Sequence, residues 1–382
     1  MGEGIIPHSL IGTGYIVIIM NDKKILLYIQ IVLLSVLVSC NNNKEQIPIA
    51  VEWECTESNQ KDTFDIQSLF KDRYILALEE TEKSRVGNIE KLVKVDSLLF
   101  VLDNRLAMRV FVFNATTGRF INSIGRTGKG PGEYVDINDF SVDSSNGTVS
   151  LMSERHEILV YDYQGNFIRK KGLSFSADKM ESKDGKYYFA CFDEGRGSLI
   201  VTDKDMHVTH EYLENRRGEP VVLFWFPLQK MQDGTIAYFR YMDDTVYTLD
   251  KNDSLSIRYK VNFGEKGIDR ELVNKDNMLE MEATHRCCIY MCTENELYTW
   301  IGFYDDNEEH ESVLNRKTGK SFAYPTRNKI DSSLGICRYA IMYSMPGMMA
   351  TIVDSEDIKD ELVRNKDCNR VTNPGVYFLI NK

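Results

Sequence analysis

A polar turn followed by a short apolar strand recurs six times along this sequence. The first turn is Asp96-Ser97 and the last is Pro346-Gly347, and between them lie Asn146-Gly147, Asp184-Gly185, Asp233-Gly234 and Asn295-Glu296. Asn-Gly and Asp-Gly are strong hairpin signals, because a type I′ turn needs positive φ at both central residues. From Ser97 to Gly347 there are five intervals over 250 residues, or about fifty residues per repeat. Such a period is typical of solenoids and propellers.

A second hairpin follows each of the first five turns by ten to twenty residues. Its clear copies are residues 112–120 and 160–167, and looser copies are residues 200–205, 247–253 and 313–319. Two hairpins make a four-stranded antiparallel sheet, which cannot bury both faces alone. Sheets stacked around an axis do bury them, so we predict an all-β fold, a six-bladed β-propeller of four-stranded antiparallel blades. A pair of β-sandwiches or a barrel is the alternative interpretation.

The two ends of the chain are expected to close this ring. Residues 375–380 read as a strand where a sixth second hairpin would begin, but the chain ends before its turn. The additional strand at residues 74–78 is its natural partner in the last sheet. Two helix-prone insertions, 269–281 and 355–364, are expected to lie outside the ring. No Pro/Ser-rich linker interrupts residues 60–382, so we predict one domain there.

The first forty residues predict that the protein is exported, and they are not expected to be part of the folded domain. A basic start at Met20-Asn-Asp-Lys-Lys24 precedes the apolar run 25–38, and the run ends in Leu37-Val-Ser-Cys40. This order is typical of a secretory signal, and its end resembles the bacterial lipoprotein signal, in which the cysteine is acylated. We therefore assign residues 1–40 to an upstream extension and signal peptide, Cys40 to lipidation, and residues 41–59 to a flexible tether. A cleaved signal without lipid, or an uncleaved anchor, is the alternative.

Charge and cysteine content narrow the possible partners. The chain has 46 basic and 57 acidic residues and a formal net charge of −11, without a compensating Lys/Arg cluster. Because phosphate backbones would be repelled, nucleic acid is not expected as a partner. Seven cysteines follow Cys40, and an odd number cannot all pair in intrachain disulfides.

A glycine-rich loop, Gly125-Arg-Thr-Gly-Lys-Gly-Pro-Gly-Glu-Tyr134, separates two predicted strands. We interpret it as a fixed connection, because glycine permits positive φ and proline removes a hydrogen-bond donor. Its structural residues would be Gly125, Gly128, Gly130, Pro131, Gly132, Glu133 and Tyr134. A phosphate cradle is the alternative, but it needs a following helix N-terminus and a Lys-Ser/Thr ending, and the sequence has neither.

These features together resemble the six-bladed β-propeller lipoproteins of Bacteroidetes, which have NHL-like repeats. The shared strings are Gly130-Pro-Gly-Glu-Tyr134, the hairpin Tyr161-Asp-Tyr-Gln-Gly-Asn-Phe167 and Asn373-Pro374 before the last strand. The resemblance covers residues 60–382. It implies the propeller fold and an outer-membrane lipoprotein of the cell envelope, facing the periplasm or the exterior. It implies no particular activity.

Candidate binding residues are few, and the sequence assigns no catalytic residue. Arg126, Arg155 and Arg196 could line one mouth of the channel and suit an anionic ligand, and Trp225 could stack on a sugar or peptide group. Cys287, Cys288 and Cys292 form the densest group of soft ligands. As a regular strand, that segment would place Cys288 and Cys292 on one face and Cys287 on the other, so we interpret them as packing between blades.

We therefore expect a monomeric, lipid-anchored binding module for a glycan, a peptide or an envelope protein, with no metal and no other cofactor. The alternative is a propeller enzyme, either a metal-dependent lyase or a glycoside-acting protein, at the central-channel face. The five histidines after Cys40 are scattered along the chain, which does not favour a lyase metal site. A purely structural role in an envelope complex is the third possibility.

Overall fold

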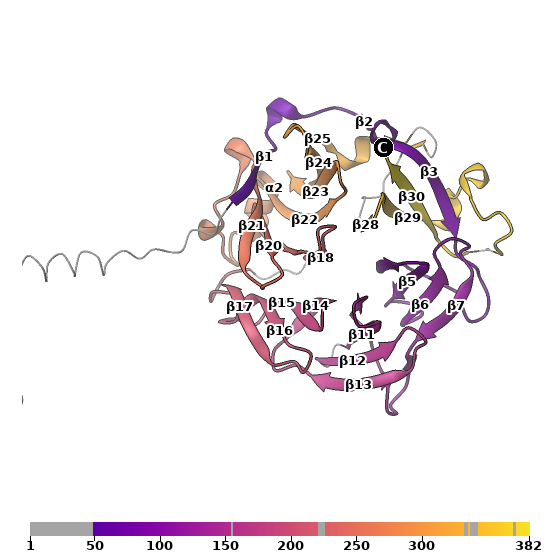
Figure 1. Ribbon diagram of the computed structural model, residues 1–382. Coiled ribbons are helices and arrows are strands. Elements are labelled where there is room, and N and C mark those ends of the chain that lie inside the picture. Colours follow the sequence, from indigo (N-terminus) through magenta and orange to yellow (C-terminus); the bar gives the residue numbers. More distant parts are fainter. Residues whose placement is uncertain (1–48, 154–155, 221–225, 332–334, 337–342, 370–371) are drawn as a thin grey trace, which may run out of the picture. The chain divides into compact units, whose positions relative to one another are not determined.

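Six sheets stand around a common centre in the part of the chain that can be described (Figure 1). The computed structural model describes residues 49–382 except 154–155, 221–225, 332–334, 337–342 and 370–371. Residues 47–382 make up one compact unit, and the description below concerns that unit alone. Its sheets form a six-bladed β-propeller, which confirms the fold class predicted from the repeat.

The first three blades are each built from four consecutive strands. From the centre outward, blade 1 contains β4 (Lys91–Val95), β5 (Leu98–Asp103), β6 (Arg109–Asn114) and β7 (Phe120–Ile124). Blade 2 contains β10 (Asp139–Asp143), β11 (Thr148–Ser153), β12 (Glu157–Asp162) and β13 (Phe167–Gly172). Blade 3 contains β14 (Ala177–Lys183), β15 (Lys186–Cys191), β16 (Gly197–Thr202) and β17 (Val208–Glu214).

The last three blades continue this order, and the sixth borrows a strand. Blade 4 contains β18 (Leu228–Lys230), β19 (Ile236–Tyr238), β20 (Thr245–Leu249) and β21 (Leu255–Asn262). Blade 5 contains β22 (Arg286–Glu294), β23 (Tyr298–Asp305), β24 (Glu308–Asn315) and β25 (Ser321–Pro325). Blade 6 contains β28 (Tyr343–Met345), β29 (Met348–Val353) and β30 (Gly375–Asn381), with β3 (Phe70–Ala77) outermost.

Ring closure joins the two ends of the fold, as predicted. β3 pairs antiparallel with β30, with Tyr74 opposite Phe378 and Ile75 opposite Tyr377. The hydrophobic core is divided among the blade interfaces, because one buried apolar cluster lies between each pair of neighbouring blades. Each blade therefore buries both faces only because it has neighbours on both sides.

The two hairpins of each repeat owe their turns to local chemistry. Asp162 Oδ1 accepts hydrogen bonds from the backbone N–H groups of Gln164 and Asn166, at 3.0 and 2.8 Å. Asp203 and Asp250 make the same turn in the next two blades. A carboxylate that bonds its own backbone in this way fixes a tight turn.

These turns and the first hairpin turns lie at one end of the blades, the hairpin face. The connections between blades lie at the opposite end, the loop face.

The N-terminal part of the expected tether is outside the described residues, but its later part belongs to the fold. β1 (Ile49–Glu54) pairs in parallel with β21 and adds a fifth strand to the edge of blade 4. Trp53 is fully buried and donates from its indole nitrogen to Ser312 Oγ of blade 5, at 3.0 Å. Residues 49–59 thus carry β1 and η1 (Glu57–Asn59) instead of a flexible linker.

Short elements complete the blade connections. β2 (Phe64–Asp65) forms a three-stranded sheet with β26 (Lys329–Asp331) and β27 (Gly335–Ile336), and it is flanked by η2 (Ile66–Leu69) and η5 (Thr326–Asn328). The insertion at 263–285 holds η3 (Gly264–Lys266), η4 (Arg270–Leu272) and α2 (Met278–Thr284).

The second insertion contains less helix than the sequence predicts. Residues 355–364 form only the 3-10 turns η6 (Ser355–Asp357) and η7 (Asp360–Leu362). A ten-residue helix is marginal by itself. Here the segment instead bonds to the edge of blade 6, where Arg364 N–H donates to Ile75 O at 3.0 Å. None of the helices described is long and apolar enough to cross a membrane.

Candidate functional site

A cavity of about 220 Å³ lies in the central channel of the ring. All six innermost strands, β4, β10, β14, β18, β22 and β28, contribute lining residues. Its walls include the side chains of Phe226 and Tyr343 together with Lys91, Lys94 and Lys230. Small-molecule sites commonly combine apolar walls with a few polar groups in such a concavity. This cavity is therefore the candidate functional site.

Two lysines and two carboxylates from four blades form a buried network beside this cavity. Lys91 Nζ of β4 lies 3.1 Å from Asp139 Oδ1 of β10 and 3.0 Å from Glu181 Oε1 of β14. Lys230 Nζ of β18 lies 3.4 Å from Glu181 Oε2, and it also donates to the Val142 carbonyl. Because the two positive and two negative charges balance, the network ties four blades together without a net charge.

Burial and charge pairing act in opposite directions on the pKa values of this network. Burial alone would lower the pKa of Lys91, but Asp139 and Glu181 outweigh it and raise that pKa. Burial alone would raise the pKa of Glu181, but the two lysines lower it. Burial raises the pKa of Asp139 despite the attraction of Lys91.

Lys230 behaves differently from Lys91. Its side chain keeps 31% of its surface accessible, facing the channel rather than bulk water. Removal from bulk water lowers its pKa, and Glu181 only partly opposes this effect. Lys230 is thus the ammonium of the network that gives up its proton more readily.

Three further polar groups in the cavity wall have no hydrogen-bond partner among the described residues. Thr293 Oγ1 is buried, with 1% of the residue exposed, and accepts or donates no hydrogen bond among the described residues. The side chains of Lys94 and Gln229 likewise make no hydrogen bond or ion pair with another described residue. A buried polar group without a partner costs free energy, and a ligand could satisfy it.

Counted over the described residues, the cavity also carries one uncompensated positive charge. The cations lining it are Lys91, Lys94 and Lys230, whereas the carboxylates that line it or pair with them are Glu181 and Asp139. Three positive against two negative charges leave one cation unpaired, and this is Lys94. An unpaired ammonium in a cavity can attract a negatively charged ligand.

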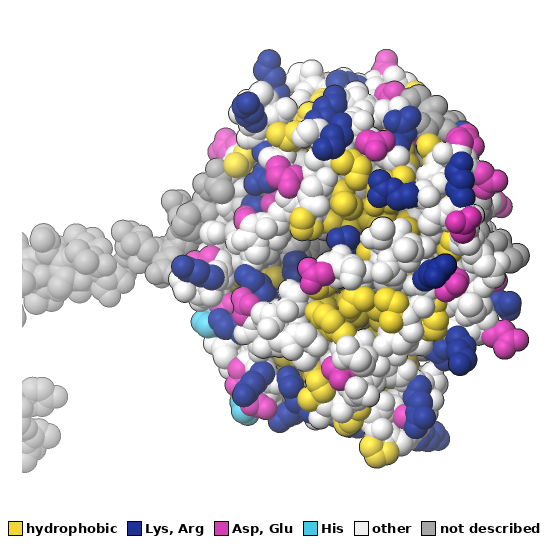
Figure 2. Space-filling view, turned by 45° about the vertical axis from the view of Figure 1, so that its right-hand side comes forward, with side chains coloured by type: hydrophobic (Ala, Val, Ile, Leu, Met, Phe, Trp, Pro, Cys, Tyr) yellow, Lys and Arg dark blue, Asp and Glu magenta, His cyan; other side chains and the backbone are white. Residues whose placement is uncertain are grey.

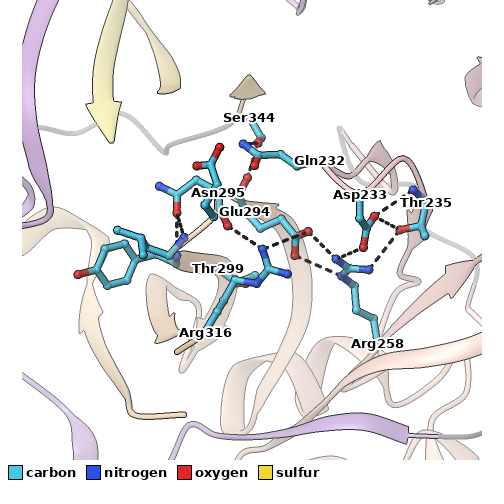
Figure 3. A network of polar contacts seen from close by, with 12 residues as sticks. Gln232, Asp233, Thr235, Arg258, Glu294, Asn295, Thr299, Arg316 and Ser344 are labelled. Atoms are coloured by element: carbon cyan, nitrogen blue, oxygen red, sulfur yellow. Dashed lines mark hydrogen bonds and ion pairs between the residues drawn. The ribbon is translucent and has the colours of Figure 1, made fainter. Parts of the chain in front are cut away.

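A second network of polar contacts joins blades 4, 5 and 6 (Figure 3). Arg258 Nη2 contacts Glu294 and also Asp233 Oδ2, the latter at 2.8 Å, and Tyr259 donates to Glu294 Oε2 at 3.0 Å. Ser344 of blade 6 donates to the Glu294 carbonyl. Burial would lower the pKa of Arg258, but the charge of Glu294 raises it. Since these groups satisfy one another, we interpret the network as a clamp between blades 4, 5 and 6.

The glycine-rich loop lies between the outer strand of blade 1 and the inner strand of blade 2. Its β8 (Arg126–Thr127) and β9 (Glu133–Tyr134) pair in parallel. Gly125 and Gly132 have φ of +66° and +71°, and a Cβ at Gly125 would lie 2.8 Å from the Tyr134 ring. Gly128 and Pro131 lie in the same turn. Local packing therefore explains the glycines.

The carboxylate of Glu133 organises this loop. It accepts from the Gly130 N–H at 2.7 Å, and Arg126 Nε lies 2.6 Å away. The Gly130 hydrogen bond and the Arg126 charge lower the pKa of Glu133. Arg126 itself is 76% exposed. An internal anion thus occupies the position that a bound phosphate would need.

Two of the four predicted binding residues, Arg126 and Arg196, can be placed in the structure, and both lie away from the cavity. Arg196 makes a two-pronged contact with Glu211 on the outer strand of blade 3, at 2.6 and 3.1 Å. Neither Arg126 nor Arg196 lines the cavity. Arg155, Trp225 and Cys40 lie outside the described residues.

Sequence reasoning missed the lysines at the centre of the ring. Lys91, Asp139, Glu181 and Lys230 each stand in the strand that precedes a first hairpin turn. A charged residue in the innermost strand of a predicted propeller is the signal that could have identified them, because that strand lies against the axis.

Charged side chains elsewhere are mixed rather than segregated. Figure 2 shows Lys/Arg and Asp/Glu side chains interspersed over the visible face, with hydrophobic side chains gathered in two areas near its middle. Across the described ranges, no group of three or more His, Cys, Asp or Glu side chains is placed to hold a metal ion.

Comparison with known proteins identifies a family and related folds. A family model described as Domain of unknown function (DUF4934) matches residues 46–379. The crystal structure of a Bacteroides fragilis protein thought to be exported has a TM-score of 0.68 at 16% identity, covering 87% of this chain and 99% of its own. A member of the DUF4221 family from Bacteroides vulgatus has a TM-score of 0.49 at 10% identity, covering 89% and 99%. No curated protein matches the sequence.

Proposed function

The chain belongs to the DUF4934 family of domains of unknown function, and from that premise we propose that it is an exported, lipid-anchored binding module whose central channel holds an anionic ligand. The ligand class is an acidic glycan or an acidic peptide, free or displayed by an envelope partner. NHL-like kinship and a monomeric state are part of the same proposal.

The observation that carries this proposal is that Lys94, Gln229 and Thr293 line one cavity and have no polar partner among the described residues. A carboxylate entering the channel would gain an ion pair with the Lys94 ammonium and hydrogen bonds from the Gln229 amide and the Thr293 hydroxyl. Charge-assisted hydrogen bonds are the stronger kind, and they are stronger again away from bulk water. Phe226 and Tyr343 would supply apolar contact for the rest of the ligand.

Export and lipid attachment are supported by the N-terminal sequence. Cys40 follows the apolar run and a small residue, in the order of a lipoprotein signal. Because β1 begins at Ile49, the linker after Cys40 would be residues 41–48. Eight residues span at most roughly 30 Å. A lipid at Cys40 would thus keep the propeller close to the membrane surface.

Binding measurements on the full chain test the proposal. The probes are uronic-acid oligosaccharides and acidic hexapeptides, each compared with its neutral counterpart by calorimetry. We expect an acidic probe to bind, and Lys94→Met to weaken its affinity by about tenfold to a hundredfold, the worth of a hydrogen bond to a charged group. Lys129→Met, in the exposed glycine-rich loop, is the matched control and should bind normally.

Two results would overturn the proposal. One is that neither acidic probe binds better than its neutral counterpart. The other is that Lys94→Met binds the acidic probe as tightly as the wild-type chain. Thr293→Val, which keeps the side-chain shape and removes the hydroxyl, reports on the same cavity without changing its charge.

A further inference from the structure

Five sulfur-containing side chains gather on the loop face between blades 4 and 5, away from the central cavity. Cys287 and Cys288 come from β22, and Met242 comes from the connection between β19 and β20. Met278 and Met281 of α2 pack against them. We call these five residues the sulfur cluster. α2 lies against β22 and β23.

The sulfur atom of Cys288 is in direct contact with two of the others. Cys288 Sγ lies 3.1 Å from Cys287 Sγ and 3.5 Å from Met242 Sδ. All three residues are buried, with exposed fractions of 3% or less. The atoms come from two separate segments of the chain, so the tertiary fold, and not sequence adjacency alone, assembles them.

An irregular backbone produces this arrangement. The register of β22 against β23 shifts between Cys287 and Met291. In a regular strand, the side chains of Cys287 and Cys288 would point to opposite faces, as the sequence predicted. The register shift instead directs both side chains into one cluster. Cys288 and Met242 have φ of +60° and +56°, a conformation that costs free energy for residues other than glycine.

We propose that Cys287, Cys288 and Met242 form a binding site for a monovalent soft metal ion, Cu(I). Thiolate and thioether sulfurs are the ligands that select Cu(I). With a metal–sulfur distance of about 2.3 Å, three sulfurs in a trigonal plane lie roughly 4 Å apart. The sulfurs of Cys287 and Met242 would then each move away from the Cys288 sulfur by less than about 1 Å. The unbranched thioether of Met242 accommodates such a shift.

Other metal ions fit this site poorly. Calcium and magnesium prefer oxygen ligands. A structural zinc ion takes four ligands, and no described group of three or more His, Cys, Asp or Glu side chains completes such a set here. Met278 and Met281 can approach the ion as further thioethers, and they otherwise keep water out of the cluster.

Binding replaces protons with the metal ion. Contact with Cys287 and burial raise the pKa of Cys288. One Cu(I) displaces the protons of both thiols, which gives two thiolates, one ion and two released protons. The titratable groups that face the cluster are Glu282 of α2, Tyr241 beside Met242, and Tyr304 of β23.

A metal ion would reach the cluster by local opening of α2. This helix has seven residues, and Leu279 on its outer side is 70% exposed. A helix of this length is held by packing rather than by its own stability, so it can open locally. The site does not depend on the proposed function of the central channel, since the two share no residue.

An anaerobic Cu(I) titration of the reduced full chain tests this inference, with bicinchoninate as the competing chelator. We expect one Cu(I) to be retained and two protons to be released at neutral pH. X-ray absorption should show a first shell of sulfur alone. Met242→Leu should weaken retention by at least about tenfold and Cys287→Ser by about a hundredfold or more, in line with the loss of one soft ligand.

The control is Cys191→Ser, which removes a buried thiol in blade 3 outside the cluster and should retain Cu(I) normally. Met242→Leu conserves volume, so it keeps the test valid even where Cys287→Ser fails to fold. The inference is overturned when the chelator strips Cu(I) from the wild-type chain. It is also overturned when retention is unchanged in Met242→Leu and Cys287→Ser, or when Cys191→Ser loses it to the same extent.

Discussion

At the scale of single residues, Lys91 holds two buried carboxylates in place. Its ammonium is within 3.1 Å of both Asp139 and Glu181, and its side chain is only 9% exposed. Lys91→Met keeps most of the volume but leaves those carboxylates with too little positive charge. We expect a loss of roughly 3–5 kcal/mol in the free energy of unfolding, the usual result when one partner of a buried pair is removed. Urea unfolding followed by fluorescence measures it.

The matched control is Lys170→Met, which removes a lysine paired with Glu157 at the surface. That pair is about half exposed, so its loss should change stability by less than about 1 kcal/mol. Equal effects of the two substitutions would contradict the role given to Lys91.

The chemistry of single side chains was only partly predictable. Arg126 and Arg196 were expected at the mouth of the channel, yet each has an acidic partner close by in the chain, Glu133 or Glu211. Lys91, in contrast, meets Glu181 of another blade. Sequence patterns report short-range pairing well, but which strand residues reach the axis depends on the packing of all six blades.

At the scale of elements, substitutions in β1 test whether this strand is part of the fold. Trp53 is fully buried between blades 4 and 5 and bonded to Ser312, whereas Val51 on the same strand is 37% exposed. We expect Trp53→Ala to lower the free energy of unfolding by about 3–5 kcal/mol, because it removes a large buried side chain. Val51→Ala should cost much less. If Trp53→Ala and Val51→Ala lowered the free energy of unfolding equally, or if Trp53→Ala had no effect, β1 would be part of the flexible tether and not of the fold.

Elements were predictable where their signals are local. The hairpin turns carry their own chemistry, as Asp162 does for the turn between β12 and β13. β1 was missed because its partner, β21, lies about two hundred residues further along the chain. The register shift in β22 was missed for a similar reason, since nothing in the string Cys287-Cys288 specifies how many residues face β23.

At the scale of the whole molecule, the ring is closed by a single strand pair. Each blade interface buries one apolar cluster, and the interface between blades 6 and 1 is no exception. Among the six blades as described, blade 6 is the one whose sheet is completed by strands from opposite ends of the chain. Stability of the ring as a unit should therefore depend on the β3–β30 pair more than on any pair within a hairpin.

Leu76→Pro tests this dependence. The N–H of Ala77 donates to Asn365 and the carbonyl of Ile75 accepts from the N–H of Arg364, so both groups point away from β30. Because backbone groups of successive residues in a strand point to opposite sides, the N–H and C=O of Leu76 point toward β30. A proline there removes a ladder hydrogen bond and should cost about 3 kcal/mol or more beyond the packing loss seen in Leu76→Ala. Because each blade needs both neighbours, far-ultraviolet circular dichroism and tryptophan fluorescence should still report one coincident transition, at lower urea. Separate transitions, with Trp53 between blades 4 and 5 keeping its native fluorescence while blade 6 melts, would show that the blades are stable without a closed ring.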